Sequence, residues 1–362
     1  MRAVQLFVHW KKGLGFLAVS SVLGLALVTS QGMAQDNEQS LLAQARALFA
    51  PLPDVKPTDD PVAKSRIELG KALFFETRGS SDGRISCASC HNPAYYGTDA
   101  LSVSQGVHGK KLPRNAHTVF NTHLLVSQHY GGNRETVEEQ AQKAVTSLAA
   151  YGNRSYEEFE ARLRSLGYDS WFTKAFPGEA QPITAVNWAI AIGAYERTLV
   201  TPAPFDRYLK GDTRAISTEA KAGLSKFIST GCVGCHSGVT VGGQSFQKFG
   251  ITQDYWLATG STEKELLGGR DQGRFHDTKK DEDRWIFKVP QLRNVAMTAP
   301  YFHDGSVAKL ADAVKIMARL QLGKSLSDED TQLIVAFLNT LTGQIPPNFS
   351  SVPLLPTQAY MN

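Results

Sequence analysis

Two five-residue motifs contain all four cysteines of the chain. They read Cys87-Ala88-Ser89-Cys90-His91 and Cys232-Val233-Gly234-Cys235-His236. Each has the C-x-x-C-H pattern, in which two thiols bond covalently to a porphyrin and the histidine is placed to ligate its iron. The sequence therefore predicts two covalently attached haem c groups, with His91 and His236 as iron ligands, and a redox protein.

Zinc knuckles or dithiol redox centres are the alternative for cysteines at this spacing. A structural zinc site usually has two knuckles close together in sequence, whereas Cys87 and Cys232 lie in different halves of the chain. A dithiol centre does not account for a histidine directly after both motifs. The haem interpretation explains both features.

The N-terminus predicts export. Positively charged residues precede an apolar run over residues 13–29, and the small residues of Gly32-Met33-Ala34 follow. This is the layout of a signal peptide at residues 1–34, with cleavage before Gln35; an uncleaved membrane anchor is the alternative. Because haem attachment to C-x-x-C-H takes place outside the bacterial cytoplasm, we expect a periplasmic protein.

The charge balance excludes some partners. The chain has a formal net charge of +4, of which three positive charges lie in the predicted signal peptide. The nearly neutral remainder favours neither nucleic acid nor an anionic membrane as a partner. Its length is sufficient for two domains.

Each motif follows a predicted helix, at residues 65–75 and 219–228, in which a glycine precedes Leu and Phe. Ser217 is the expected cap of the second helix. We expect each helix to cross the last helix of its domain and to deliver the cysteines to the porphyrin edge. Strand signals are few, and further helices are expected at residues 136–148, 155–166, 185–199, 310–320 and 327–341.

The predicted fold is mainly α, with two cytochrome c-like domains that each bind one covalently attached c-type haem. The segment Thr201-Pro202-Ala203-Pro204 is typical of a linker. We therefore predict an N-terminal domain at residues 35–200, a C-terminal domain at residues 201–346 and a tail at residues 347–362. Gly-rich stretches at residues 238–250 and 268–273 are expected to be loops around the second haem.

The methionines separate the two haems. Two of the five lie in the predicted signal peptide, and Met297, Met317 and Met361 follow the second motif. The first haem must therefore have a histidine, a weaker ligand or an open position opposite His91. In the second domain Met317 or, as the alternative, Met297 can reach the iron, and a Met/His pair raises the reduction potential. We expect a low-potential, reactive first haem and a high-potential second haem that accepts electrons.

From about residue 41 to residue 346 the chain resembles the bacterial dihaem cytochrome c peroxidases. The resemblance implies reduction of hydrogen peroxide to water, with electrons from a small periplasmic cytochrome c or a cupredoxin. The family tends to form dimers, so a homodimer is expected. Besides the two motifs, the matching segments are residues 68–75, Pro113-Arg114-Asn115, Thr118-Val119-Phe120-Asn121, Ala194-Tyr195-Glu196, Pro204-Phe205-Asp206, Leu292-Arg293-Asn294 and residues 298–305.

The resemblance also implies residue roles. His108 matches the histidine that caps the first haem iron in the resting enzyme and leaves when the other haem is reduced. Met317 matches the methionine ligand of the second haem iron. Asn115, Thr298 and Pro300 match a calcium site between the domains, the last two through carbonyl oxygens, and oxygen-only ligation suits calcium.

The sequence departs from this family around the peroxide site. Tyr130 stands where the family has a tryptophan between the haems, and His117 replaces a usual proline. The family's distal glutamate falls near Ala149 or Ala150, and residues 141–156 contain no acidic residue. A positioned general acid typically contributes about 10²–10⁴ in rate, so its loss affects the chemistry more than the fold.

Two interpretations follow. In the first, which we favour, His129, Tyr130 or Gln142 supplies the proton and the protein remains a peroxidase. In the second, it is a MauG-like oxidase of a protein substrate or a dihaem electron carrier. The MauG-like enzyme has a tyrosine where this chain has Met317, which argues against an oxidase. A methionine-free first domain with a releasable histidine argues against a simple carrier.

Overall fold

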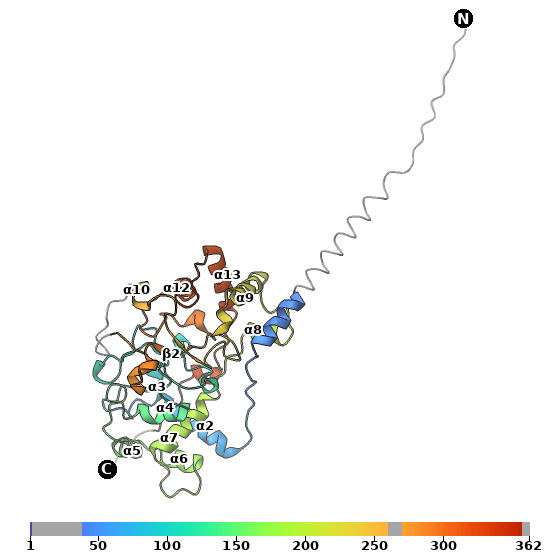
Figure 1. The fold of residues 1–362 in the computed structure, drawn as a ribbon. Coiled ribbons are helices and arrows are strands. Elements are labelled where there is room, and N and C mark those ends of the chain that lie inside the picture. Colours follow the sequence, from blue (N-terminus) through green and yellow to red (C-terminus); the bar gives the residue numbers. More distant parts are fainter. Residues whose placement is uncertain (2–37, 260–269, 357–362) are drawn as a thin grey trace.

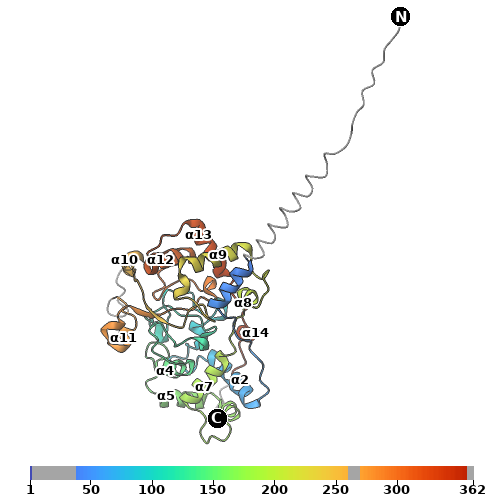
Figure 2. The same cartoon turned by 45° about the vertical axis from the view of Figure 1, so that its right-hand side comes forward.

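The computed structural model describes Met1, residues 38–259 and residues 270–356. Apart from Met1, the predicted signal peptide and its cleavage site before Gln35 lie outside the described residues. Within the described ranges, no helix is both long and apolar enough to cross a membrane. The protein is mainly helical, as the sequence predicts, and its helices gather at two opposite ends of the molecule (Figure 1, Figure 2).

Each helix expected from the sequence is present, with ends displaced by a few residues. Five unpredicted helices, α6, α8, α10, α11 and α14, are four to seven residues long, too short to show apolar periodicity. The helix at residues 38–48 is longer and was also not predicted. After a helix at residues 38–48, the elements are α2 (Pro61–Phe75), α3 (Cys87–Cys90), α4 (Val137–Ala144), α5 (Tyr156–Ser165), α6 (Asp169–Ala175), α7 (Ala185–Glu196), α8 (Pro204–Leu209), α9 (Thr218–Thr230), β1 (Phe246–Lys248), α10 (Tyr255–Thr259), α11 (Phe275–Thr278), β2 (Ile286–Lys288), α12 (Leu310–Leu322), α13 (Asp328–Asn339) and α14 (Pro347–Ser350).

The first half is organised by the crossing of α2 and α7. A Cβ atom on Gly70 would lie 1.8 Å from the carbonyl oxygen of Ala191, so the approach of the two helices requires glycine. Next to this contact, the rings of Phe74 and Tyr195 meet edge to face with their centroids 5.4 Å apart. The helix that leads into the first motif therefore crosses the last helix of its half, as predicted.

The second half repeats this crossing with α9 and α13. A Cβ atom on Gly223 would also lie 1.8 Å from a carbonyl oxygen, that of Leu333. The rings of Phe227 and Phe337 occupy the place of Phe74 and Tyr195, with centroids 5.2 Å apart. Ser217 caps α9, as predicted, by accepting a hydrogen bond from the Ala220 backbone. The same helix pair is thus built twice.

The segment that joins the halves is buried. Asn121 and Asn294, each in the left-handed backbone region and each fully buried, donate hydrogen bonds from Nδ2 to Oγ1 of Thr201, at 3.0 and 2.9 Å. Thr201 itself is fully buried. The predicted linker at Thr201-Pro202-Ala203-Pro204 therefore connects the halves as a packed segment to which both contribute one asparagine.

Two hydrophobic clusters form the cores, one in each half. The helix at residues 38–48 lies in the range predicted for the N-terminal domain but packs in the second cluster through Leu42 and Ala45. Conversely, Phe349 of the predicted tail packs in the first cluster. The chain therefore crosses between the halves near both ends; the division at residue 200 otherwise stays a prediction.

One short antiparallel pair, β1 with β2, lies at the second half. It places a strand in the Gly-rich stretch at residues 238–250, which the sequence predicts to be only a loop. Three residues are too few for an alternating pattern to reveal a strand.

Candidate functional site

The first motif forms α3 and the turn after it. Nδ1 of His91 lies 3.0 Å from the carbonyl oxygen of Gly97 and therefore donates to it, which leaves Nε2 for an iron. Metal-binding histidines are commonly oriented by such a second hydrogen bond. Burial lowers the pKa of His91, so the ring is neutral, the form that ligates metals. The Cys87 thiol lies 3.3 Å from the Tyr151 hydroxyl.

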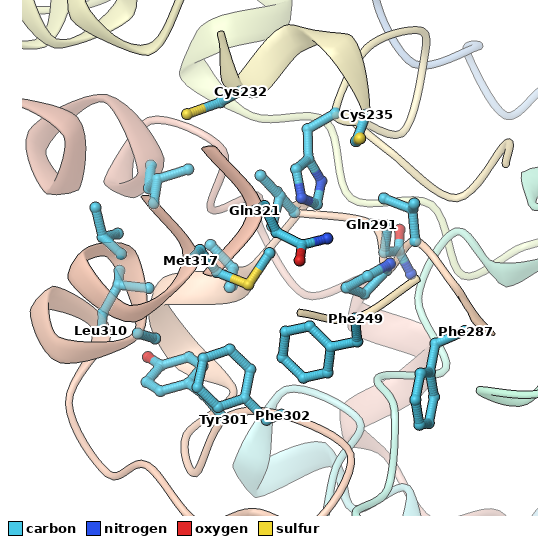
Figure 3. A pocket seen from close by; sticks show the side chains of 18 of the residues that line it. Cys232, Cys235, Phe249, Phe287, Gln291, Tyr301, Phe302, Leu310, Met317 and Gln321 are labelled. Carbon is cyan, nitrogen blue, oxygen red and sulfur yellow. The ribbon is translucent and has the colours of Figure 1, made fainter. Parts of the chain in front are cut away.

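The second motif faces a cavity of about 240 Å³ with a mainly apolar lining. Cys232, Cys235, His236 and Met317 all line it, and Figure 3 shows the cysteines at one edge and the Met317 thioether pointing inward. Burial lowers the pKa of His236 to about 4. Two thiols, a neutral imidazole and a thioether around one apolar cavity fit a covalently attached haem with Met/His ligation.

Met297, the alternative ligand, is about half exposed and is not among the residues that line this cavity. The difference arises from the elements that carry the two side chains. Met317 belongs to α12, which packs against α13, whereas Met297 ends a 3₁₀ turn at Val295–Met297. The geometry therefore supports Met317.

The four cysteines form no disulfide. Burial raises the pKa of Cys87 to about 12 and that of both Cys90 and Cys232 to about 11. No group of three or more Cys, His, Asp or Glu in the described ranges could hold a metal ion. The structure thus gives the zinc alternative no ligand set in the part of the chain that it describes.

His108 lies in a tight turn close to the first motif. Its backbone is left-handed, with φ of +56°, and its exposed ring has Nδ1 4.0 Å from Oδ2 of Asp82. The preceding residues pack against the place of the missing glutamate. The Val107 backbone donates to the Ala150 carbonyl, and a Cβ on Gly106 would lie 1.9 Å from the Ala149 oxygen.

The structure therefore brings the predicted capping histidine and the missing-acid position together. In addition, the Cys90 thiol lies 3.9 Å from the carbonyl oxygen of Gln105, in the same loop. Whether His108 binds the first haem iron stays a prediction.

Tyr130 and His117 form a tilted pair of rings in close contact, with interplanar angle 31°. Their ring centroids are 3.8 Å apart, and both rings line the second cavity. The backbone carbonyl of His117 lies beside the His91 ring, where it raises the pKa of that histidine and so partly offsets burial. The pair thus extends from His91, the predicted iron ligand of the first site, to the cavity of the second.

The predicted proton donors differ in their surroundings. Tyr130 donates its hydroxyl hydrogen to the Phe302 carbonyl at 3.2 Å, and burial raises its pKa. His129 is exposed, with Nδ1 2.9 Å from Oδ1 of Asn133. Gln142 is half-buried on α4. In the described ranges, no hydrogen bond, ion pair or ring contact joins any of the three to the first motif, so their catalytic role stays a prediction.

The three predicted calcium ligands lie together. Asn115, Thr298 and Pro300 all line the second cavity. The Asn115 side chain donates through Nδ2 to the Leu101 carbonyl at 2.7 Å, and its backbone donates to the His303 carbonyl at 2.8 Å. Oxygen donors of this kind suit calcium, and the binding of calcium by these three residues stays a prediction.

Three charged features of the structure were not predicted as functional from the sequence. Arg114 of the first half makes two hydrogen bonds to Asp271 of the second, at 2.7 and 2.8 Å. Lys288 is almost fully buried, and burial lowers its pKa to about 8. Glu196 is buried at the end of α7. The hexapeptides at residues 194–199 and 336–341 resemble one another, and comparison of the two could have singled out Glu196 from the sequence.

Comparison with known proteins agrees with this architecture. The sequence model for "Di-haem cytochrome c peroxidase" matches residues 64–214. The cytochrome c551 peroxidase of Pseudomonas aeruginosa is 41% identical over 317 residues, which cover 86% of this chain and 89% of the relative. The cytochrome c551 peroxidase of Nitrosomonas europaea is 36% identical, with 96% of each chain covered.

A solved structure of a MauG-like protein associated with microbial copper homeostasis has a TM-score of 0.70 and 28% identity. The match covers 83% of this chain and 97% of that protein. Relatives of this identity and coverage confirm the predicted family, and with it a peroxidase-type oxidoreductase whose two C-x-x-C-H motifs imply two c-type haems. The chain therefore belongs to the di-haem cytochrome c peroxidase family.

Proposed function

We propose that this protein is a periplasmic peroxidase that reduces hydrogen peroxide to water with electrons from a small cytochrome c or a cupredoxin. Each peroxide takes up two electrons and two protons and gives two water molecules. Two relatives that cover most of the chain and are named cytochrome c551 peroxidases support the reaction. The N-terminal sequence supports the compartment.

The observation that carries the proposal is the asymmetry of the two sites. Met317 lines the second cavity, while the sequence between the signal peptide and the second motif contains no methionine. The second site can therefore hold its iron closed with two protein ligands. The first site can be opened, which a substrate-binding site requires.

Haem bound at these sites supplies the redox chemistry, and the chain supplies position and access. His91 and His236 are the iron ligands in this proposal, and the four cysteines fix the porphyrins. His108 is the group that closes the first site at rest, from a turn packed against Ala149 and Ala150. Tyr130, which packs against His117, and His129 are the proton donors in this proposal. The oxygen donors of Asn115, Thr298 and Pro300 would hold a calcium ion beside that route.

The test is steady-state peroxide turnover by the haem-loaded, half-reduced protein with a reduced small cytochrome c as the electron donor. Peroxide-dependent oxidation of the donor is expected, and it should be lost in Cys87→Ser/Cys90→Ser. The matched control is Met297→Leu, which should leave turnover unchanged. No donor oxidation by wild-type protein with both haems attached and reducible, with a cupredoxin tested in parallel, would refute the proposal.

A MauG-like oxidase is the second candidate, and the similarity to the MauG-like structure favours it. The residues between the sites also differ from the peroxidase pattern, since Tyr130 and His117 stand there. Peroxide-dependent oxidation of a partner protein, without donor turnover, would identify this activity. The presence of Met317 in the second cavity favours the peroxidase.

A further inference from the structure

The ends of α7 and α13 repeat one another. Residues 194–199 read Ala-Tyr-Glu-Arg-Thr-Leu and residues 336–341 read Ala-Phe-Leu-Asn-Thr-Leu. In the first segment the Leu199 backbone donates to the Glu196 carbonyl at 3.0 Å; in the second, Leu341 donates to Leu338 at 3.1 Å. The carbonyl oxygens of both leucines accept from the matched asparagines Asn121 and Asn294 at 3.0 Å. Glu196 and Leu338 are therefore equivalent positions.

Leu338 lines the second cavity together with Cys232 and His236. The equivalent position therefore directs Glu196 toward the first porphyrin site. An independent observation agrees: after burial, the negative charge of Glu196 is among the causes that raise the pKa of the Cys87 thiol. The first site thus has a carboxyl group where the second site has an apolar side chain.

This carboxyl group is buried and unpaired. Glu196 is 6% exposed, and no hydrogen bond or ion pair links its carboxylate to another residue in the described ranges. The adjacent Arg197 instead pairs with Glu138 of α4. Burial, followed by the negative charge of Glu138, raises the pKa of Glu196 to about 8. The positive charge of Arg197 acts in the opposite direction but does not outweigh these two causes. A buried carboxyl group without a hydrogen bond is costly, which points to a functional reason for its presence.

We propose that Glu196 is a proton-holding residue of the first haem site, which binds a proton when that haem is reduced and releases it when the haem is oxidised. One electron from the donor adds one negative charge to the buried site. One proton from solvent, bound by the Glu196 carboxylate, offsets that charge. The inference rests on haem attachment at Cys87 and Cys90 and does not depend on which oxidant the enzyme uses.

The other titratable groups near Glu196 are few. Glu138 faces it from α4 and Arg197 follows it on α7, and these two are paired with each other. His123, in the 3₁₀ turn at Thr122–Leu124, lies in the field of the same pair. Burial raises the pKa of the adjacent Tyr195, so its hydroxyl stays neutral. In the haem-loaded protein, Cys87 is a thioether and does not titrate.

The test is the midpoint potential of the first haem as a function of pH, measured by spectroelectrochemistry on the haem-loaded full chain. Reduction raises the proton affinity of the carboxylate, so the potential should fall as pH rises between the pKa values of the oxidised and reduced states. For a one-electron couple the full slope is about 59 mV for each tenfold change in proton concentration. Wild-type protein should show a slope that approaches this value over part of the range from about pH 5 to about pH 10.

Glu196→Gln should remove that slope, and Glu196→Asp should retain it over a shifted range. Glu196→Leu gives the first half the residue of the second and provides a second variant if the glutamine form does not fold. Glu138→Gln is the matched control, since it removes the neighbouring acid and should keep the slope. An equal slope in wild type, Glu196→Gln and Glu196→Leu would refute the proposal, as would a potential independent of pH in wild type. Because the readout is a potential, a protein without peroxide turnover can still pass or fail this test.

Discussion

The two halves of the molecule share one scaffold and differ in a few side chains. Each half crosses two helices at a glycine, Gly70 or Gly223, against a carbonyl oxygen 1.8 Å from the position of a Cβ. Each sends one buried asparagine to Thr201. The comparison teaches that glycines and asparagines at tight contacts define the architecture, while other positions can vary without changing it.

The positions at which the two halves differ lie at the predicted haem sites. The second cavity contains Met317, and the first half contains no methionine after the predicted signal peptide. Glu196 in the first half stands where the second has Leu338. The backbone carbonyls of His117 and Pro290 lie beside the two histidines predicted to bind iron, but only His117 adds a ring that packs against Tyr130. One scaffold thus carries two sites with different side chains, for which we predict different potentials and reactivities.

The largest effect is expected from filling the helix crossings. Gly70→Ala and Gly223→Ala should each lower the free energy of unfolding by about 1–3 kcal/mol or more, because the new methyl group overlaps a backbone carbonyl. Thermal unfolding of the haem-loaded protein measures this loss. Gly234→Ala is the control, because a Cβ there meets no atom within 4 Å. Equal melting temperatures for all three variants would show that the crossings are not the shared constraint.

Exchange of the second iron ligand should make the two sites more alike. Met317→His replaces a thioether with an imidazole, which lowers the reduction potential of the bound haem. We expect a fall on the order of 100 mV, within the roughly 0.8 V range that axial ligands control, in a redox titration. Met297→Leu is the control and should change the potential little. A large fall in potential for Met297→Leu with little change for Met317→His would instead identify Met297 as the ligand.

Loss of the ion pair between the two halves should lower the stability of the protein. Asp271→Asn removes the charge that Arg114 pairs with, and we expect a cost of about 1.5–3 kcal/mol. Burial alone would raise the pKa of Asp271, but the Arg114 hydrogen bonds outweigh burial and lower it. The stabilisation is therefore present above the ordinary aspartate pKa of about 3.9 and is lost as pH falls through the lower folded-state value.

Unfolding measured from neutral to acidic pH tests this prediction. The wild type should lose more stability than Asp271→Asn as pH falls below about 4. Parallel curves for the two proteins would show that the pair contributes nothing that depends on pH.

The smallest effect is expected at the pair of Tyr130 and His117. Tyr130→Phe keeps the ring on His117 and removes the hydrogen bond to the Phe302 carbonyl, at a cost of about 1 kcal/mol in stability. Because the Tyr130 proton is held by that carbonyl and its pKa is raised, we expect peroxide turnover within about tenfold of wild type. A loss of about 10²–10⁴ would instead identify Tyr130 as the replacement acid.

The sequence by itself determined the motifs, the methionine asymmetry and the longer helices other than that at residues 38–48. These depend on local information: the C-x-x-C-H pattern, apolar spacing along one helix, and capping residues such as Ser217. Short elements such as α6 and the β1–β2 pair could not be predicted from the sequence. Helices of four to seven residues and strands of three residues are too short to show a periodic pattern.

Only the tertiary structure decided which distant residues meet. It placed the helix at residues 38–48 in the second core and Phe349 in the first. It packed His117 against Tyr130, paired Arg114 with Asp271, and buried Glu196 without a partner in the described ranges. None of these contacts is encoded by a local pattern, since each depends on how two halves with the same scaffold pack around Thr201. The sequence alone therefore predicts the haem-attachment motifs. The burial of Glu196, which makes the two sites differ in electrostatics, depends on tertiary packing.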